Sequence, residues 1–404
     1  MNYQEILSQL SEDQKKTVSI QFPGTLPDGR LYFGCGTFLE IGKEAKKLEA
    51  TKAVIITGPT LVSLGVADQA AELLAEEGIR SVVFDQVPPE PHLDAMKEAA
   101  AVVRQEKADL VIGLGGGSPM DTAKLAAVAG ANVESVDELV QNPTEAINAS
   151  LPTILVPTTS GTGSEVSPYI VYSDGGRKGF VTSAYTYATI ALIDPLLTVT
   201  MPPSVTAATG LDALTHGTEG ATGKPNPYTL AMSSRCAELI FCFLPRAVKD
   251  GNDIEARTGM AFASVLGMLA YTQGGGLYAH SISYILTIEK DCAHGLGCGL
   301  ALPYTLRYNW EMIPDLLYNL QESINRSEDY HADSADEVIA QFKKLTEDIG
   351  MPSDLKAVGF TEDDMPAFAD TLVTGYYRAN NPRSMSPEEA LTLSTAMLNG
   401  TLDF

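Results

Sequence analysis

The chain is poor in cysteine and in basic side chains. Its 404 residues include five cysteines, an odd number, and no two of them form a C-x-x-C pair. This pattern does not fit a disulfide framework and favours reduced thiols in a cytosolic protein. Only 27 residues are Lys or Arg against 51 acidic ones, so the formal net charge is −24. A surface of this sign repels nucleic acid and anionic membranes, so we expect neither as a partner, and an anionic ligand needs a local exception.

Targeting and membrane signals are also missing. The first residues contain no basic region followed by an apolar run, so they do not resemble a signal peptide. The most apolar stretch, 260–288, is interrupted by the glycines at 274–276 and contains His280. A buried pair of helices explains this stretch better than a membrane span. With 45% hydrophobic and 19% charged residues, the composition is that of a globular protein with a large core. The length of 404 residues suggests two or three domains, and we expect a cytoplasmic protein.

The first half of the chain alternates short apolar runs with longer amphipathic stretches. The apolar runs predict strands at 53–57, 81–84, 109–114 and 152–156. The stretches between them predict helices at 61–77, 93–107 and 119–129. Continuous apolar strands separated by helices indicate a parallel sheet covered on both faces. The expected fold is an α/β, doubly wound, Rossmann-like domain over residues 1–200, with its ligand at the carboxyl ends of the strands.

From about residue 202 the pattern becomes helical. Helices are predicted at 206–220, 228–248, 254–272, 335–349 and 387–399. Ser334 and Ser386 each precede a first turn with acidic residues, which is typical of a helix start. We expect an all-α domain over residues 201–404.

A glycine-rich segment follows the third predicted strand and opens a helix: Gly113-Leu-Gly-Gly-Gly-Ser-Pro-Met-Asp-Thr-Ala-Lys124. Consecutive glycines let a backbone approach an anion, and the helix N-terminus supplies free N–H groups and a favourable dipole. The segment is neither a G-x-G-x-x-G nor a Walker A motif, and a tight turn is the alternative explanation. With the flanking strand and helix, we interpret it as a pyrophosphate site. A second loop, 157–165, is rich in hydroxyls and glycines, which alone is a weak signal.

The chain has five histidines, and one of them lies four residues after an acid. On a helix, Asp212 and His216 would share one face and could hold one divalent cation. His280 and His294 form a second region fourteen residues apart. Each histidine alone is more often a hydrogen-bonded core or surface residue. Spacing therefore leaves a metal site and ordinary structural roles equally open.

Four motifs together resemble the iron-containing alcohol dehydrogenase family over nearly the full chain. They are GGGSPMDTAK at 115–124, PTTSGTGSE at 157–165, GLDALTH at 210–216 and the pair His280 and His294. The resemblance implies a dehydroquinate synthase-like architecture, with a dinucleotide-binding domain, a helical domain and an active site in the cleft between them. The implied activity is metal-dependent hydride transfer between NAD or NADP and a small alcohol or aldehyde, in a homo-oligomer such as a dimer.

The resemblance also assigns residues. It implies the metal ligands Asp212, His216, His280 and His294. The metal is Fe²⁺ in many relatives, which is the first expectation here, and Zn²⁺ in others; a mixed nitrogen and oxygen ligand set does not decide between them. The implied cofactor contacts are Gly116, Gly117, Ser118, Asp121, Thr158, Thr159, Thr162 and Lys178.

The chain departs from the family pattern at two places. Gly58 stands where NAD-preferring relatives often carry an acid that holds the adenosine ribose, so the repulsion of a 2′-phosphate is removed and NADP is allowed. Tyr284 stands where many relatives have a histidine near the nicotinamide. A tyrosine with a pKa near ~10 is a poor base at neutral pH, so Tyr284 is either a proton-relay donor or simple pocket lining.

Three alternatives stay open at this point. A lyase related to dehydroquinate synthase and a glycerol dehydrogenase-like enzyme share the architecture, and a non-catalytic nucleotide-binding protein is a candidate from another class. The retained ligands argue against the last. Tyr169 and Tyr271 are expected near the pocket by position in the family. The substrate itself is not readable, and an anionic aldehyde would require an Arg or Lys that the sequence does not place.

Overall fold

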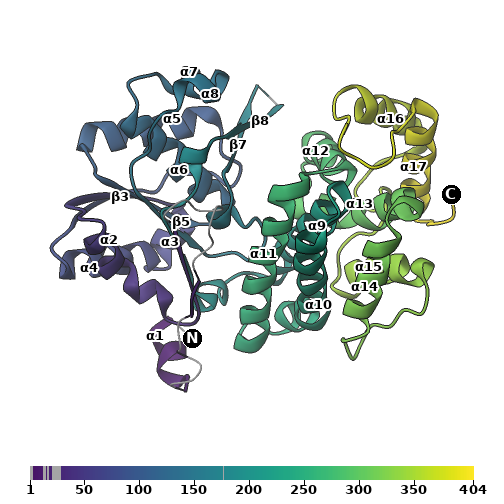
Figure 1. Ribbon diagram of the computed structural model, residues 1–404, viewed down its shortest axis with the longest axis horizontal. Coiled ribbons are helices and arrows are strands. Elements are labelled where there is room, and N and C mark those ends of the chain that lie inside the picture. The colour runs from purple at the N-terminus through teal and green to yellow at the C-terminus, as the bar shows by residue number, and fades with distance from the viewer. Residues whose placement is uncertain (1–2, 12–14, 16–17, 21–28, 176) are drawn as a thin grey trace. The chain divides into compact units, whose positions relative to one another are not determined.

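The computed structural model describes residues 3–11, 15, 18–20, 29–175 and 177–404. The chain divides into two compact units, and each is described separately. The first contains 1–159 and 163–198, and the second contains 160–162 and 199–404. Figure 1 colours the first unit purple to teal and most of the second green to yellow.

The first unit is built on a mainly parallel sheet. Within the described residues it has seven strands in the order β1-β2-β9-β6-β5-β3-β4. All neighbours run parallel except β1 and β2. Because β3 is followed in the chain by β4 on one side and then β5 on the other, the strand order reverses there, which is where doubly wound sheets bind ligands. The strands are β1 Val18–Ile20, β2 Arg30–Phe33, β3 Lys52–Ile56, β4 Arg80–Phe84, β5 Leu110–Gly115, β6 Thr153–Pro157 and β9 Ile190–Ile193.

Helices cover both faces of this sheet. Along β3, Val54 and Ile56 pack into one buried cluster, while Ala53 and Ile55 pack into another. The first cluster contains residues of α5 (Leu93–Glu106) and α6 (Gly117–Ala131), and the second contains residues of α2 (Ile41–Lys47) and α4 (Val66–Glu76). Figure 1 shows these helix pairs on opposite sides of the sheet. The alternation follows from the two-residue period of a strand, and it confirms the doubly wound α/β prediction.

The predicted strands and helices of the first unit are present, with one correction. The single helix expected at 61–77 is divided into α3 (Pro59–Ser63) and α4. Gly65 lies between them with a φ of 75°, a left-handed conformation that ends one helix before the next begins. The sequence reading also missed β1, β2, β9 and the hairpin of β7 (Tyr169–Asp174) and β8 (Arg177–Thr182). The remaining elements are α1 Tyr3–Gln9, α7 Val136–Gln141, α8 Pro143–Ala146 and the 3₁₀ turns Thr37–Glu40, Ser164–Val166, Ala184–Thr186 and Pro195–Thr198.

The second unit is helical, as predicted. All five predicted helices are present, and the apolar stretch 260–288 forms parts of two buried helices rather than one span. No helix among the described residues is both long enough and apolar enough to cross a membrane. The helices are α9 Pro203–Gly223, α10 Pro227–Lys249, α11 Ile254–Gly274, α12 Tyr278–Lys290, α13 His294–Asn309, α14 Pro314–Ile324, α15 Ala335–Asp348, α16 Met365–Thr374 and α17 Pro387–Asn399, with 3₁₀ turns Trp310–Met312 and Glu362–Asp364.

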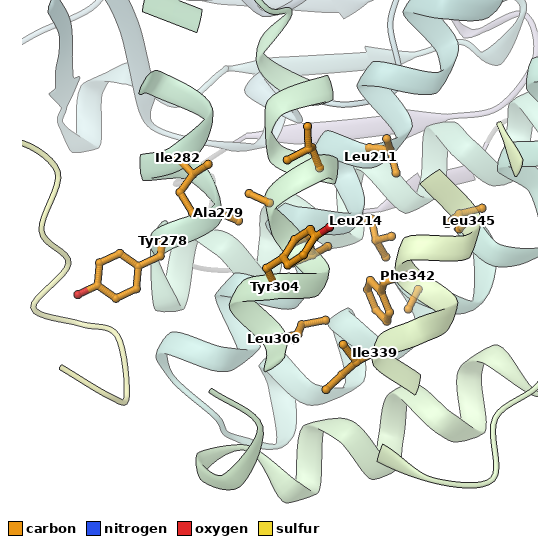
Figure 2. Close-up of a cluster of buried hydrophobic side chains, with 14 of the residues drawn as sticks. Leu211, Leu214, Tyr278, Ala279, Ile282, Tyr304, Leu306, Ile339, Phe342 and Leu345 are labelled. Atoms are coloured by element: carbon orange, nitrogen blue, oxygen red, sulfur yellow. The ribbon is translucent and has the colours of Figure 1, made fainter. Parts of the chain in front are cut away.

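A large apolar cluster holds α9 in place within this unit. Leu211 and Leu214 of α9 lie in the same buried cluster as Tyr304 of α13 and Phe342 of α15 (Figure 2). Complete burial of one leucine side chain contributes about 1.5–3 kcal/mol to folding. Because Asp212 lies between the two leucines in sequence, the packing of α9 also fixes the position of this carboxylate.

Candidate metal centre

The four ligands implied by the resemblance come from three helices of the second unit. Asp212 and His216 lie four residues apart on α9, His280 lies in the first turn of α12, and His294 is the first residue of α13. Asp212, His216 and His280 are buried, and the His294 side chain is 32% exposed. The structure therefore brings together side chains that are up to 82 positions apart in sequence, counting from 212 to 294.

All three imidazoles point one nitrogen at the same carboxylate oxygen. Asp212 Oδ1 lies 3.8 Å from His216 Nε2, 4.0 Å from His280 Nε2 and 3.7 Å from His294 Nε2. These separations are too long for hydrogen bonds but suit donors arranged around a shared cation. Asp212 Oδ1 and His280 Nε2 are buried, and neither has a hydrogen-bond partner. Buried polar atoms are normally satisfied, so this pair indicates a cation-binding centre.

The opposite ring nitrogens are held by acceptors. His280 Nδ1 lies 2.6 Å from Glu219 Oε2, His216 Nδ1 lies 3.3 Å from the Gly161 carbonyl, and His294 Nδ1 lies 2.9 Å from Ser283 Oγ. Since Ser283 donates its own proton to the His294 carbonyl, its oxygen accepts from the ring. These partners place the proton on Nδ1 and leave Nε2 as a lone-pair donor toward the centre.

The charges at the centre favour metal binding. Burial and the neighbouring histidines lower the pKa of His280 well below its usual value, so this imidazole is neutral, as a ligand must be. Burial alone would raise the pKa of Asp212, but its interactions with His216, His294 and His280 lower the pKa overall. Asp212 is therefore an ionised, anionic donor.

Sequence reasoning missed two residues of this centre. Cys298 lies one helical turn after His294 on α13, and its Sγ is 3.6 Å from His294 Nε2. Donor atoms of Asp212, His280, His294 and Cys298 all lie within 4.8 Å of one another. Glu219, three residues after His216 on α9, is 3% exposed and accepts the His280 ring proton. The i,i+4 spacing of His294 and Cys298 and the i,i+3 spacing of His216 and Glu219 were the available signals.

Two tyrosines line the centre. Tyr271 packs against the rings of His216 and His280, with ring centroids 4.7 and 5.0 Å away. The Tyr284 ring stacks on His294 at 5.4 Å, with an angle of 13° between the planes. Burial raises the pKa of Tyr284 above its ordinary value. Its hydroxyl therefore stays protonated at neutral pH and can donate a hydrogen bond, but it does not act as a base.

The glycine-rich segment of the first unit has the backbone expected of a phosphate loop. Gly115 ends β5 with a φ of 148°, Gly116 precedes the helix, and α6 begins at Gly117. A Cβ on Gly115 would lie 2.7 Å from Pro119 Cγ, so the turn requires glycine. The loop after β6 lies beside it, because Thr158 N donates to the Gly115 carbonyl at 2.9 Å.

The other side chains implied in cofactor binding have varied surroundings. Thr159 lies beside Gly116, because a Cβ on Gly116 would be 3.4 Å from Thr159 Oγ1. Ser118 donates to the Pro89 carbonyl, and Lys178 pairs with Glu90 at 2.5 Å. Asp121 is turned inward: it accepts from Val171 N at 3.0 Å and from Ser164 Oγ at 2.5 Å. Thr162 belongs to the second unit by its contacts.

Comparison with known proteins decides the family. The chain matches the iron-containing alcohol dehydrogenase model over residues 28–195 and the C-terminal model of the Fe-containing alcohol dehydrogenase family over residues 206–398. The chain belongs to the iron-containing alcohol dehydrogenase family. It is 34% identical to long-chain-alcohol dehydrogenase 1 of Geobacillus thermodenitrificans, covering 92% of this chain and 95% of that protein. It is also 34% identical to sulfoacetaldehyde reductase of Bilophila wadsworthia, covering 91% and 97%.

The fold agrees with solved members of the family. An alcohol dehydrogenase from Oenococcus oeni is similar with a TM-score of 0.84 and 30% identity, covering 91% of this chain and 97% of that one. The chain is thus a metal-dependent alcohol dehydrogenase or aldehyde reductase that acts on CH–OH donors with a nicotinamide cofactor. The prediction of an alcohol dehydrogenase is confirmed over that of a lyase.

Proposed function

We propose that this enzyme interconverts a small aldehyde and its alcohol at a divalent cation held by Asp212, His216, His280 and His294. The observation that carries the proposal is the convergence of three Nε2 atoms on one unpartnered oxygen of Asp212, at 3.7–4.0 Å. A bound divalent cation polarises a carbonyl oxygen and stabilises an alkoxide, while a nicotinamide supplies or accepts the hydride. Location in the cytoplasm and assembly into a homo-oligomer stay predictions.

The residues around the centre orient and shield the reacting groups. Glu219, Ser283 and the Gly161 carbonyl fix the three rings so that the Nε2 lone pairs meet. The Tyr271 ring packs against His216, and the Tyr284 ring stacks on the face of His294, so both rings shield part of the imidazole surface from water. With a raised pKa, Tyr284 supplies a hydrogen bond to the substrate oxygen at most, so the proton is exchanged with water or with cofactor hydroxyls.

We assign the cofactor diphosphate to the N-terminus of α6. The free N–H groups that follow Gly116 and the helix dipole favour an anion there. Thr158, Thr159, Thr162, Ser118 and Lys178 are assigned to the cofactor by resemblance, whereas Asp121 orders the loop from inside through Ser164. Because Gly58 carries no carboxylate, NADP is accepted as well as NAD.

An aldehyde panel tests the function. Metal-stripped protein is assayed with NADH and NADPH, with and without added Fe²⁺ or Zn²⁺. Cofactor oxidation is expected only when metal and an aldehyde are both present, since carbonyl polarisation requires the cation. No oxidation with any aldehyde, metal and cofactor combination contradicts the proposal.

Cys298 changes the expected metal. Its thiol lies among the ligand atoms, and a thiolate is a soft donor that suits Zn²⁺ better than Fe²⁺. A bound cation would displace the thiol proton. The chain's own residues thus favour Zn²⁺ over the Fe²⁺ that the resemblance suggests first.

Cobalt replacement is expected to reveal this thiolate. Co²⁺-loaded protein should show a near-ultraviolet sulfur-to-metal charge-transfer band that Cys298→Ser lacks. Zn²⁺ affinity should fall by more than about 10-fold, since losing a residue that only supports the ligands already costs about 10–100-fold. Cys292→Ser is the control, because Cys292 is two residues before His294 but outside the cluster. Identical spectra for wild type and Cys298→Ser would exclude the thiolate ligand.

A further inference from the structure

One cation beside the metal centre, the guanidinium of Arg378, has no carboxylate partner among the described residues. Arg378 lies in the loop after α16, and its Nε donates to Ser281 Oγ at 2.8 Å, next to the ligand His280. Its Cζ lies 5.8 Å from the centroid of the Tyr284 ring, which stacks on His294. Burial and the neighbouring histidines lower the pKa of His280 most, and the positive charge of Arg378 lowers it further. Arg378 therefore acts electrostatically on the centre.

The other arginines of the second unit are committed elsewhere. Arg257 is buried and donates to Gly251 O, Thr206 Oγ1 and Met201 O. The remaining five have a carboxylate within 4.0 Å: Arg235, Arg246, Arg307, Arg326 and Arg383. Among the described residues, no carboxylate lies within that distance of Arg378, whose guanidinium donates to the Ser281 hydroxyl and lies over the Tyr284 ring.

Glu219 does not neutralise Arg378 by direct contact. The carboxylate oxygens of Glu219 accept from Leu277 N, Ala279 N and His280 Nδ1, at 2.6, 2.7 and 2.6 Å. Its three hydrogen bonds are therefore made inside the centre. The chain has a net charge of −24, so its overall electrostatic field repels anions. The partly buried guanidinium of Arg378, which has no ion-pair partner among the described residues, is a local exception where an anion is attracted.

We infer that Arg378 binds the anionic head of the substrate, so that the enzyme prefers short aldehydes carrying a sulfonate or carboxylate. A guanidinium recognises planar or tetrahedral oxyanions with two parallel hydrogen bonds. The ring centroids of His294 and Tyr284 are 5.4 Å apart, and Arg378 Cζ lies 5.8 Å from the Tyr284 centroid. These distances limit the length of the substrate between its carbonyl and its anionic group. At about 1.5 Å per bond, this suits a short aldehyde of about two to four carbons in all, counting the carbonyl carbon. The inference rests on the proposed function of the metal centre.

Matched aldehydes test the inference. The probes are 2-oxoethanesulfonate, 4-oxobutanoate and the neutral butanal, compared by kcat/KM in metal-loaded wild type and Arg378→Gln. The variant should lose about 10–100-fold with the two anionic aldehydes, as expected for loss of charge-assisted hydrogen bonds, and less than about threefold with butanal. Arg378→Lys should recover part of the loss, because it keeps the charge.

Arg383→Gln is the control for the change in charge. Arg383 lies five residues further along the same loop, but it pairs with Glu389 at 2.6 Å. The Arg383→Gln variant should leave the preference between anionic and neutral aldehydes unchanged. An equal loss with all three aldehydes in Arg378→Gln would mean that Arg378 only supports Ser281, and it would overturn the inference. A wild-type preference for butanal would do the same.

Failure of the metal chemistry would be distinguishable. If no aldehyde is turned over, the proposed function fails, and the anion site is tested by titrating metal- and cofactor-loaded protein with 2-hydroxyethanesulfonate in a calorimeter. Binding to wild type and not to Arg378→Gln supports the site. Equal binding, or none to wild type, overturns it.

Discussion

Replacing His280 with alanine is expected to remove metal and turnover together. His280 is 1% exposed, its Nε2 has no hydrogen-bond partner, and its Nδ1 is held by Glu219. The variant loses one converging donor and leaves Asp212 Oδ1 with two imidazoles. Loss of metal polarisation is worth about 4 kcal/mol of barrier, or about 10³-fold in rate.

The measurement is metal content by elemental analysis alongside kcat/KM with the best aldehyde. His331→Ala is the matched control, since that side chain is 68% exposed and pairs with Asp333 at the surface. It should keep wild-type metal content and rate. Normal turnover by a metal-free His280→Ala protein is the result that refutes the mechanism, and near-ultraviolet circular dichroism separates metal loss from misfolding.

Local patterns predicted much of the fold because each element has a strong period. The central strands β3 and β5 are apolar apart from Lys52 at the start of β3, and α10 and α15 are amphipathic, so their positions were predicted to within a few residues. The short outer strands were missed: β2 and β9 have four residues each, too few for a period to be distinguished from a loop. Gly65 interrupts a helical pattern that continues on both sides, and only its left-handed conformation shows the break.

The site depends more on tertiary structure. The spacing of Asp212 and His216 was informative because both lie on one helix, but His280 and His294 were assigned only through the family resemblance. Nothing local indicates that their Nε2 atoms meet, because α12 and α13 are brought to α9 by packing. Arg378 is the extreme case: its contact with Ser281 spans 97 positions, and no motif marks it.

Among the residues that hold the metal ligands without binding the metal themselves, Glu219 is expected to have the largest effect on metal affinity. Its Oε2 accepts from His280 Nδ1 and Leu277 N, both at 2.6 Å, and its Oε1 accepts from Ala279 N at 2.7 Å. The three bonds tie the ligand ring to the start of α12. Burial raises the pKa of Glu219, and the N–H donors offset part of this rise. The resulting pKa is about 7. The residue thus orients His280, makes its ring a stronger donor and anchors the helix that carries it.

Glu219→Gln keeps the shape but has one acceptor oxygen and one amino group. In either orientation the amino group faces an N–H donor, so at least one buried donor is left unsatisfied, at a cost of about 1–3 kcal/mol. Metal affinity should fall about 10–100-fold, as measured by chelator competition with Zn²⁺ or Co²⁺.

Glu165→Gln is the control that separates the two roles of such a carboxylate. Glu165 is 2% exposed, and burial raises its pKa to about 7 as well, but it lies in the first unit, and the charged groups that affect its pKa are Lys124 and Asp121. Replacing it should change the unfolding temperature of the metal-free protein and leave metal affinity unaltered. If Glu219→Gln lowered stability as much as Glu165→Gln did and left metal affinity at the wild-type value, Glu219 would be a structural residue of α9 and α12. A selective loss of metal affinity would instead show that Glu219 tunes metal binding through its hydrogen bond to the ligand His280.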